Sequence, residues 1–229
     1  MLEVASAARG PICAAATRRR SVRESAAQCW RGWLGSLAAW TVMGPVLAAG
    51  VQIQVQDAAG KPLVDAVVFL ESSEARALVK PMQGAEIAQK ARLFDPAVLV
   101  VPVGTPVSFP NRDTVRHHVY SFSAAKNFEL KLYSGVPANP VVFDRTGIAV
   151  LGCNIHDAMT AWVVVVDTPY FGRSAASGAV AIAAVPAGNY RLRVWHPSLP
   201  VGAPASDQSL LVGSANLDQV IQLSGAKAP

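Results

Sequence analysis

The stretch Ile148-Ala-Val-Leu-Gly-Cys153-Asn-Ile-His156-Asp-Ala-Met159-Thr-Ala-Trp-Val-Val-Val-Val166 joins two apolar runs through a short loop. Each run has the length of a strand, and the second is apolar throughout, which predicts a strand at the centre of a sandwich. The loop carries a thiol, an imidazole and a thioether within seven residues. This segment therefore predicts both a β-fold and a chemically specialised loop at one end of it.

The rest of the chain also favours strands. Val51-Gln-Ile-Gln-Val-Gln56 and Phe128-Glu-Leu-Lys-Leu-Tyr133 alternate between apolar and polar residues, as half-buried strands do. Short apolar runs are separated by Gly, Pro, Asn and Asp, and no long stretch has a helical period. We therefore predict an all-β fold. Residues 71–84 are expected to form a loop, and residues 167–174 a linker.

Residues 1–49 differ from the remainder and are predicted to be a signal peptide. They contain six Arg and two acidic residues, followed by an apolar run that ends in Ala48-Ala49. The alternative is a membrane anchor, but the run is somewhat short for a span and is interrupted by Gly44-Pro45. Export places the mature protein in the periplasm, with no stable membrane insertion after processing.

Removal of the leader changes the charge and the cysteine count. Residues 50–229 hold fourteen Lys and Arg against thirteen Asp and Glu, and they contain no basic cluster that would neutralise phosphates. We therefore expect no nucleic-acid partner. Cys153 is the single cysteine of this part, so an intrachain disulfide is excluded and the thiol needs another role.

The loop chemistry favours copper. Sulfur ligands suit Cu(I), imidazole suits both oxidation states, and a Cys/His/His set with a weak axial Met is the type-1 (blue) arrangement. Cys153, His156 and Met159 supply three such groups, and His117-His118, at the start of another predicted strand, supplies a second imidazole. Zinc remains an alternative, although it prefers a full fourth ligand to a thioether. The plainest alternative is that all these side chains are only core residues.

Residues from about 86 to 167 resemble a cupredoxin, and among cupredoxins most of all amicyanin. The resemblance rests on Phe94-Asp-Pro96, Gly104-Thr105, Asn111, His117, Gly147 and Cys153-x2-His156-x2-Met159. It implies a Greek-key β-sandwich over residues 85–167 and one type-1 copper ion held by His117, Cys153, His156 and Met159. It places His118 where the family usually has Asn. His196 lacks a partner at ligand spacing, and we expect it to be structural.

The loop departs from amicyanin in having Ile155 and Asp157 on either side of His156, where that family has proline. The resemblance also implies that a redox protein docks near His156. The sequence Leu151-Gly-Cys-Asn-Ile-His-Asp-Ala-Met159 also resembles that of exported proteins labelled methylamine utilisation proteins.

The flanking segments resemble the two halves of a carboxypeptidase regulatory-like (transthyretin-type) sandwich. The first half, residues 50–84, contains Asp57-x2-Gly60-Lys-Pro, and the second, residues 174–224, contains Pro186-Ala-Gly-x-Tyr190. We expect a cupredoxin inserted into a small β-sandwich. The competing layout is one cupredoxin with extra strands at both ends.

The expected function is that of a monomeric one-electron carrier. A copper-binding or delivery protein is the alternative, but such proteins usually carry Met-rich or His-rich motifs, whereas residues 50–229 contain only Met82 and Met159. An enzyme with several coppers needs more ligands than the four His of the chain provide. We therefore expect no catalytic activity.

The leader generates the first testable prediction. Mass spectrometry of the protein recovered from the periplasm should give an N-terminus near residue 49 or 50, because cleavage follows small residues after the apolar run. An intact leader found in the membrane fraction would support the anchor instead.

Overall fold

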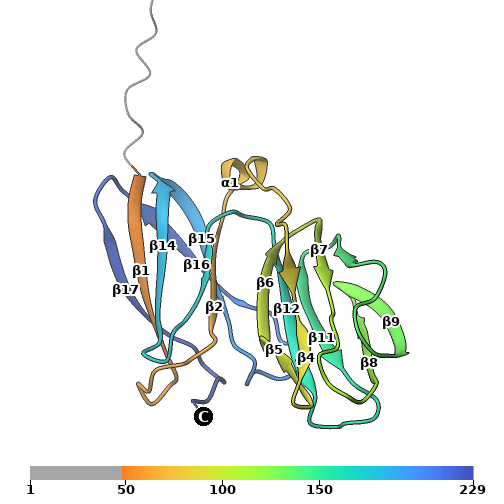
Figure 1. Ribbon diagram of the computed structural model, residues 1–229. Coiled ribbons are helices and arrows are strands. Elements are labelled where there is room, and N and C mark those ends of the chain that lie inside the picture. Colours follow the sequence, from red (N-terminus) through yellow and green to blue (C-terminus); the bar gives the residue numbers. More distant parts are fainter. Residues whose placement is uncertain (1–47, 229) are drawn as a thin grey trace, which may run out of the picture. The chain divides into compact units, whose positions relative to one another are not determined.

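The computed structural model describes residues 48–228, which are built almost entirely of β-strands (Figure 1). The elements in chain order are β1 (Ala48–Gln56), β2 (Val67–Glu71), α1 (Ser73–Ala77), β3 (Ala85–Glu86), β4 (Ala88–Lys90), β5 (Leu93–Asp95), β6 (Val98–Pro102), β7 (Thr105–Ser108), β8 (His117–Ser123), β9 (Lys126–Tyr133), β10 (Val141–Phe143), β11 (Gly147–Gly152), β12 (Thr160–Val166), β13 (Phe171–Arg173), β14 (Ala179–Pro186), β15 (Gly188–Trp195), β16 (Ser206–Val212) and β17 (Leu217–Gln222). The prediction of an all-β fold is confirmed.

The middle of the chain forms one set of sheets. A five-stranded sheet has the order β6-β12-β11-β8-β9, a three-stranded sheet has the order β10-β7-β3, and β4 and β5 form a hairpin. The two larger sheets share one apolar core, to which Val107 and Phe143 contribute from one side and Val119 and Val163 from the other. This core is the support on which the predicted ligands lie.

Strand β12 is an interior strand buried on both faces, as its apolar sequence predicted. It pairs antiparallel with β11 and parallel with β6. Val163 to Val166 are all buried, because one side of the strand faces the shared core and the other faces β2 and β15. A strand covered on both faces has no solvent side on which to place polar residues, which explains the unbroken apolar run.

The two ends of the described chain pair with each other. Strand β1 lies between β14 and β17 (Figure 1). Strand β2 lies between β13 and β15, and β16 follows β15 at the edge of that sheet. The alternation predicted for β1 is confirmed, since Val51, Ile53 and Val55 are buried. These side chains pack with Leu70, Leu192 and other buried apolar residues from the two ends of the described chain to form a second core.

The segment expected to be a linker is instead bound tightly to β2, so that expectation is wrong. Residues Phe171–Arg173 form β13, which pairs with Val67–Phe69 of β2. The buried Ser174 hydroxyl accepts the N–H of Ala66 at 2.8 Å and donates to the carbonyl of Leu63 at 2.6 Å. Buried polar groups favour a fixed geometry when their hydrogen bonds are satisfied, so this segment holds its neighbours in place.

Residues 71–84 are also not a simple loop, because they contain α1. The Ser72 hydroxyl accepts the N–H of Ala75 at 3.0 Å and caps the helix, and Glu74 lies in the first turn. Both features are usual at helix N-termini. The sequence Ser72-Ser-Glu74 is typical of a helix N-terminus, but the helix that follows is too short to show an apolar period.

A third group of buried apolar residues lies between the two sets of sheets. It includes Phe69 of β2, Trp195 of β15, and Val100 and Val164 from β6 and β12. The rings of Trp162 and Trp195 lie 6.2 Å apart. The Arg173 guanidinium adds a hydrogen bond of 3.0 Å to the carbonyl of Val98. The strands of the middle segment and those of the chain ends therefore share an apolar contact.

The predicted signal peptide lies outside the described residues, except for Ala48 and Ala49, which begin β1. In residues 48–228 no helix has the length and apolar character needed to cross a membrane.

The second core generates a stability prediction. Leu192 is fully buried in it, so Leu192→Ala should lower the free energy of unfolding by about 2–5 kcal/mol, through lost burial and the cavity that remains. The matched control is Leu211→Ala on the paired strand β16, where the side chain is 71% exposed. Urea unfolding should show a large loss for the first variant and almost none for the second; equal losses would contradict the assigned core.

Candidate metal centre

Two neighbouring strands and one loop bring together three of the four predicted ligands. His117 is the first residue of β8, Cys153 follows the last residue of β11, and His156 lies in the loop before β12. Strands β8 and β11 are adjacent in the sheet, with Gly152 opposite Tyr120. The end of β11 therefore delivers Cys153 beside the beginning of β8, although the two residues are far apart in the sequence.

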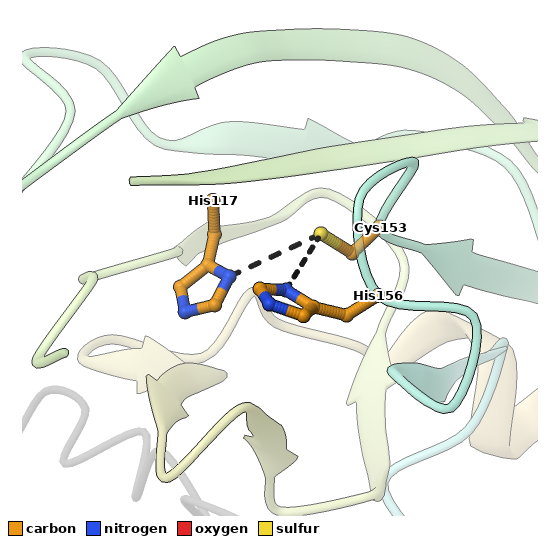
Figure 2. A group of neighbouring side chains, drawn as sticks. All are labelled: His117, Cys153 and His156. Carbon is orange, nitrogen blue, oxygen red and sulfur yellow. Dashed lines mark hydrogen bonds between the residues drawn. The ribbon is translucent and has the colours of Figure 1, made fainter. Parts of the chain in front are cut away.

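The three side chains converge on one point. The sulfur of Cys153 lies 4.0 Å from Nδ1 of His117 and 3.9 Å from Nδ1 of His156. One ligand atom from each residue falls within 4.8 Å of the others. Figure 2 shows that both imidazoles turn their Nδ1 atoms toward the sulfur.

These separations fit a shared metal ion better than direct hydrogen bonds. With metal–sulfur and metal–nitrogen bonds of about 2.0–2.3 Å, two ligand atoms on one ion stand roughly 3.3–3.9 Å apart. The distances of 4.0 and 3.9 Å from the Cys153 sulfur are close to that range and long for a thiol hydrogen bond. The donor set of one thiol and two imidazoles suits copper or zinc.

The residues of the cluster differ in burial, and this difference determines which of them solvent can reach. His117 and Cys153 are 0% and 4% exposed, whereas His156 is partly exposed and its neighbour Ile155 is 46% exposed. His156 is therefore the residue of this cluster that reaches solvent. Met159, the fourth predicted ligand, is buried in the same core as Cys153, and its N–H donates to the carbonyl of His156 at 2.9 Å.

The other two histidines lie apart from the cluster. His118 is also buried, but its Nε2 lies 3.0 Å from Glu129 without hydrogen-bond alignment, and its ring meets Tyr120 edge to face. His196 has Nδ1 2.7 Å from the hydroxyl of Ser198 and Nε2 2.8 Å from the carbonyl of Val64. Burial lowers the pKa of His196, which favours a neutral, structural imidazole.

Asp113 adjoins this cluster, although no sequence motif points to it. Its Oδ2 lies 2.8 Å from Nε2 of His117, and its two oxygens also accept the N–H groups of Ala91 and Arg92. The hydrogen bond from Arg92, supported by those from His117 and Ala91, holds the pKa of Asp113 below its usual value. The available signal was an acid four residues before a candidate ligand, which is too common to be specific.

Asn111 organises the loop that precedes β8. Its side-chain amide donates to the carbonyls of Val115 and Tyr133, both at 2.8 Å, and its oxygen accepts the N–H of Asp113 at 2.9 Å. A 5% exposed side chain with three such bonds stabilises one conformation of the loop. The position of His117 thus depends on contacts with β9.

Gly152, immediately before Cys153, lies under the ring of Tyr120 from the neighbouring strand. A Cβ atom at Gly152 would lie 2.8 Å from the ring of Tyr120, which is closer than real contacts allow. The absence of a side chain leaves room for the Tyr120 ring in this conformation, and a larger residue at Gly152 would require that ring to move.

Tyr133 forms a buried polar contact in the same region. Its hydroxyl donates to the carbonyl of Phe109 at 2.6 Å and accepts from the amide of Gln89. Burial, opposed by the hydrogen bond from Gln89 and aided by charge repulsion from the Cys153 sulfur, raises the pKa of Tyr133 to about 12. The phenol is therefore neutral at ordinary pH and works as a structural donor.

Comparison with known proteins gives partial likenesses. No protein-family model matches the chain, and no curated protein matches it. Among solved structures, a purple cupredoxin from Nitrosopumilus maritimus is 26% identical, with 36% of this chain and 99% of that chain covered and a TM-score of 0.32. A reduced amicyanin variant is 26% identical over 44% of this chain and 99% of that chain, with a TM-score of 0.33. A copper-containing nitrite reductase from Thermus scotoductus is 22% identical over 42% of this chain and 27% of that chain, with a TM-score of 0.34.

The buried phenol of Tyr133 generates a prediction about alkaline stability. Tyr133→Phe should cost about 1 kcal/mol at neutral pH, because the hydrogen bond to Phe109 is lost. In the folded protein the pKa is raised, so the stabilisation is complete below about pH 10 and declines as the pH rises toward 12.

The difference in stability between the wild type and Tyr133→Phe should therefore shrink between pH 9 and pH 11.5. Urea unfolding at several pH values measures it. The control is Tyr120→Phe, which lacks this buried hydrogen bond. A constant difference across this range would contradict the raised pKa.

Proposed function

We propose that the protein is a cupredoxin-type carrier of single electrons, exported to the periplasm, with one type-1 copper ion held by His117, Cys153, His156 and Met159. The observation that carries the proposal is the convergence of one thiol and two Nδ1 atoms within 4.8 Å in a mostly buried site. Residues 85–167 would form the cupredoxin domain, and residues 50–84 with 174–224 the small sandwich around it.

The chemistry follows from the donor set. A copper ion bound there supplies a one-electron couple, since thiolate and thioether favour Cu(I) while two imidazoles also accommodate Cu(II). The chain contributes rigidity, because His117 begins a paired strand, and the loop with Cys153 and His156 is anchored by strands at both ends. A rigid donor set rearranges little when the copper changes its oxidation state, and this favours electron transfer over binding of a substrate.

Electron exchange would occur through His156. It is the partly exposed residue of the cluster, and it lies beside the exposed Ile155 and Asp157. We propose that a redox protein docks on this loop. An apolar contact at Ile155 would exclude water, and the charge of Asp157 would act on the rate of association more than on affinity.

Copper reconstitution tests the proposal. Cu(II) added to the purified protein should produce one intense visible thiolate-to-copper charge-transfer band, with one copper bound per chain. One equivalent of reductant should bleach the band and reoxidation should restore it. Cys153→Ser should abolish the colour. A blue Cys153→Ser protein, or a wild type that binds one copper and stays colourless, would contradict the site.

The adjacent histidines provide a matched pair of variants. His117→Ala should remove the band, whereas His118→Ala should keep it, because Nδ1 of His117 lies 4.0 Å from the sulfur of Cys153 while His118 lies against Glu129 and Tyr120. Both side chains are buried, so the two substitutions disturb packing similarly. The reverse result would show that His118 is the ligand.

Retention of copper after reduction separates the carrier from the alternative delivery protein, which should release Cu(I) to a competing chelator.

A further inference from the structure

We propose, resting on the function proposed above, that Asp113 is a positioning residue that sets the tautomer of His117 and lowers the reduction potential of the bound copper. The juxtaposition that carries this inference is the 2.8 Å contact between Oδ2 of Asp113 and Nε2 of His117, on the side of the ring opposite Cys153.

The contact determines which nitrogen of His117 is free. An ionised carboxylate only accepts hydrogen bonds, so Nε2 must carry the proton. The neutral imidazole then has its lone pair on Nδ1, the atom that lies 4.0 Å from the sulfur of Cys153. His117 is fully buried, and solvent therefore cannot offer Nε2 another acceptor. Asp113 thus prepares the ring for a metal before any metal is present.

The carboxylate itself is fixed in place. Oδ1 accepts the N–H of Ala91 at 2.7 Å, and Oδ2 accepts the N–H of Arg92 at 2.9 Å. Ala91 and Arg92 form the turn between β4 and β5 and have positive φ angles of 53° and 60°. Residues other than glycine adopt this conformation at a cost, which these two hydrogen bonds offset. The turn therefore holds Asp113 against His117.

The charge of Asp113 is not neutralised by a cation. In residues 48–228, the ion pairs that reach Asp113 come from His117 alone, and the neighbouring Arg112 is paired with Glu86. The side chain is only 15% exposed, so water screens its charge weakly. A negative charge bonded to a ligand imidazole makes that ligand more basic and favours the more highly charged Cu(II).

The first arm of the experiment measures the reduction potential. Asp113→Asn retains an oxygen acceptor but removes the charge. It should keep the blue band and weaken Cu(II) binding about tenfold relative to Cu(I), which corresponds to a rise of about 59 mV for one electron.

The control for this arm is Asp157→Asn, which removes an equal charge from an exposed position beside His156. That variant should change the potential much less. An unchanged potential in Asp113→Asn, or equal shifts in the two variants, would overturn the electrostatic part of the inference.

The second arm needs no copper. Nitrogen-15 NMR of the metal-free protein should show His117 protonated at Nε2. Asp113→Ala should lose this preference. Because Asp113 also supports the turn, that substitution is made together with Ala91→Gly and Arg92→Gly, since glycine adopts positive φ without penalty. The double glycine variant with Asp113 intact is the control and should keep the wild-type tautomer.

The two arms separate failure of the inference from failure of the proposed function. A wild type that never becomes blue would contradict the copper site, while the metal-free NMR would still test Asp113. A blue wild type in which the tautomer of His117 is the same with and without Asp113 would overturn the positioning role and leave the carrier function standing.

Discussion

The pairing of β8 with β11 is the constraint on which the cluster depends. Gly152 lies opposite Tyr120, and this register brings Cys153 beside His117 although 36 residues separate them. A slip of one residue would turn His117 away from the shared core and present His118 instead, because neighbouring strand residues face opposite sides.

Polar contacts from non-adjacent segments complete the cluster. Asn111 ties the loop before β8 to Tyr133 of β9, and Asp113 links His117 to the turn between β4 and β5. Each polar group is largely buried and finds a partner on a different element. Losing one partner would leave another group unsatisfied, which costs more than a surface hydrogen bond contributes. These contacts favour one geometry at the place where three side chains must meet.

The strands at the chain ends enclose a separate apolar core and also meet the middle sheets. The hydrogen bonds of the Ser174 hydroxyl with Leu63 and Ala66 join residues more than a hundred positions apart. Phe69 and Trp195 then contact the outer side of β6 and β12. Strand β12 is consequently covered on both faces, and the support of the loop that carries Cys153 and His156 extends into the flanking strands.

The amino-acid sequence by itself determined the local features. Alternation identified β1, the unbroken apolar run identified β12, and the spacing from Cys153 to His156 and Met159 placed sulfur and nitrogen donors on one loop. The ligand role of these residues stays a prediction. Only the tertiary structure decided that β13 docks on β2, and that Asp113 and Tyr133 border the cluster. Those contacts depend on strand register and on hydrogen bonds between distant segments, which no local pattern records because each residue alone is compatible with many partners.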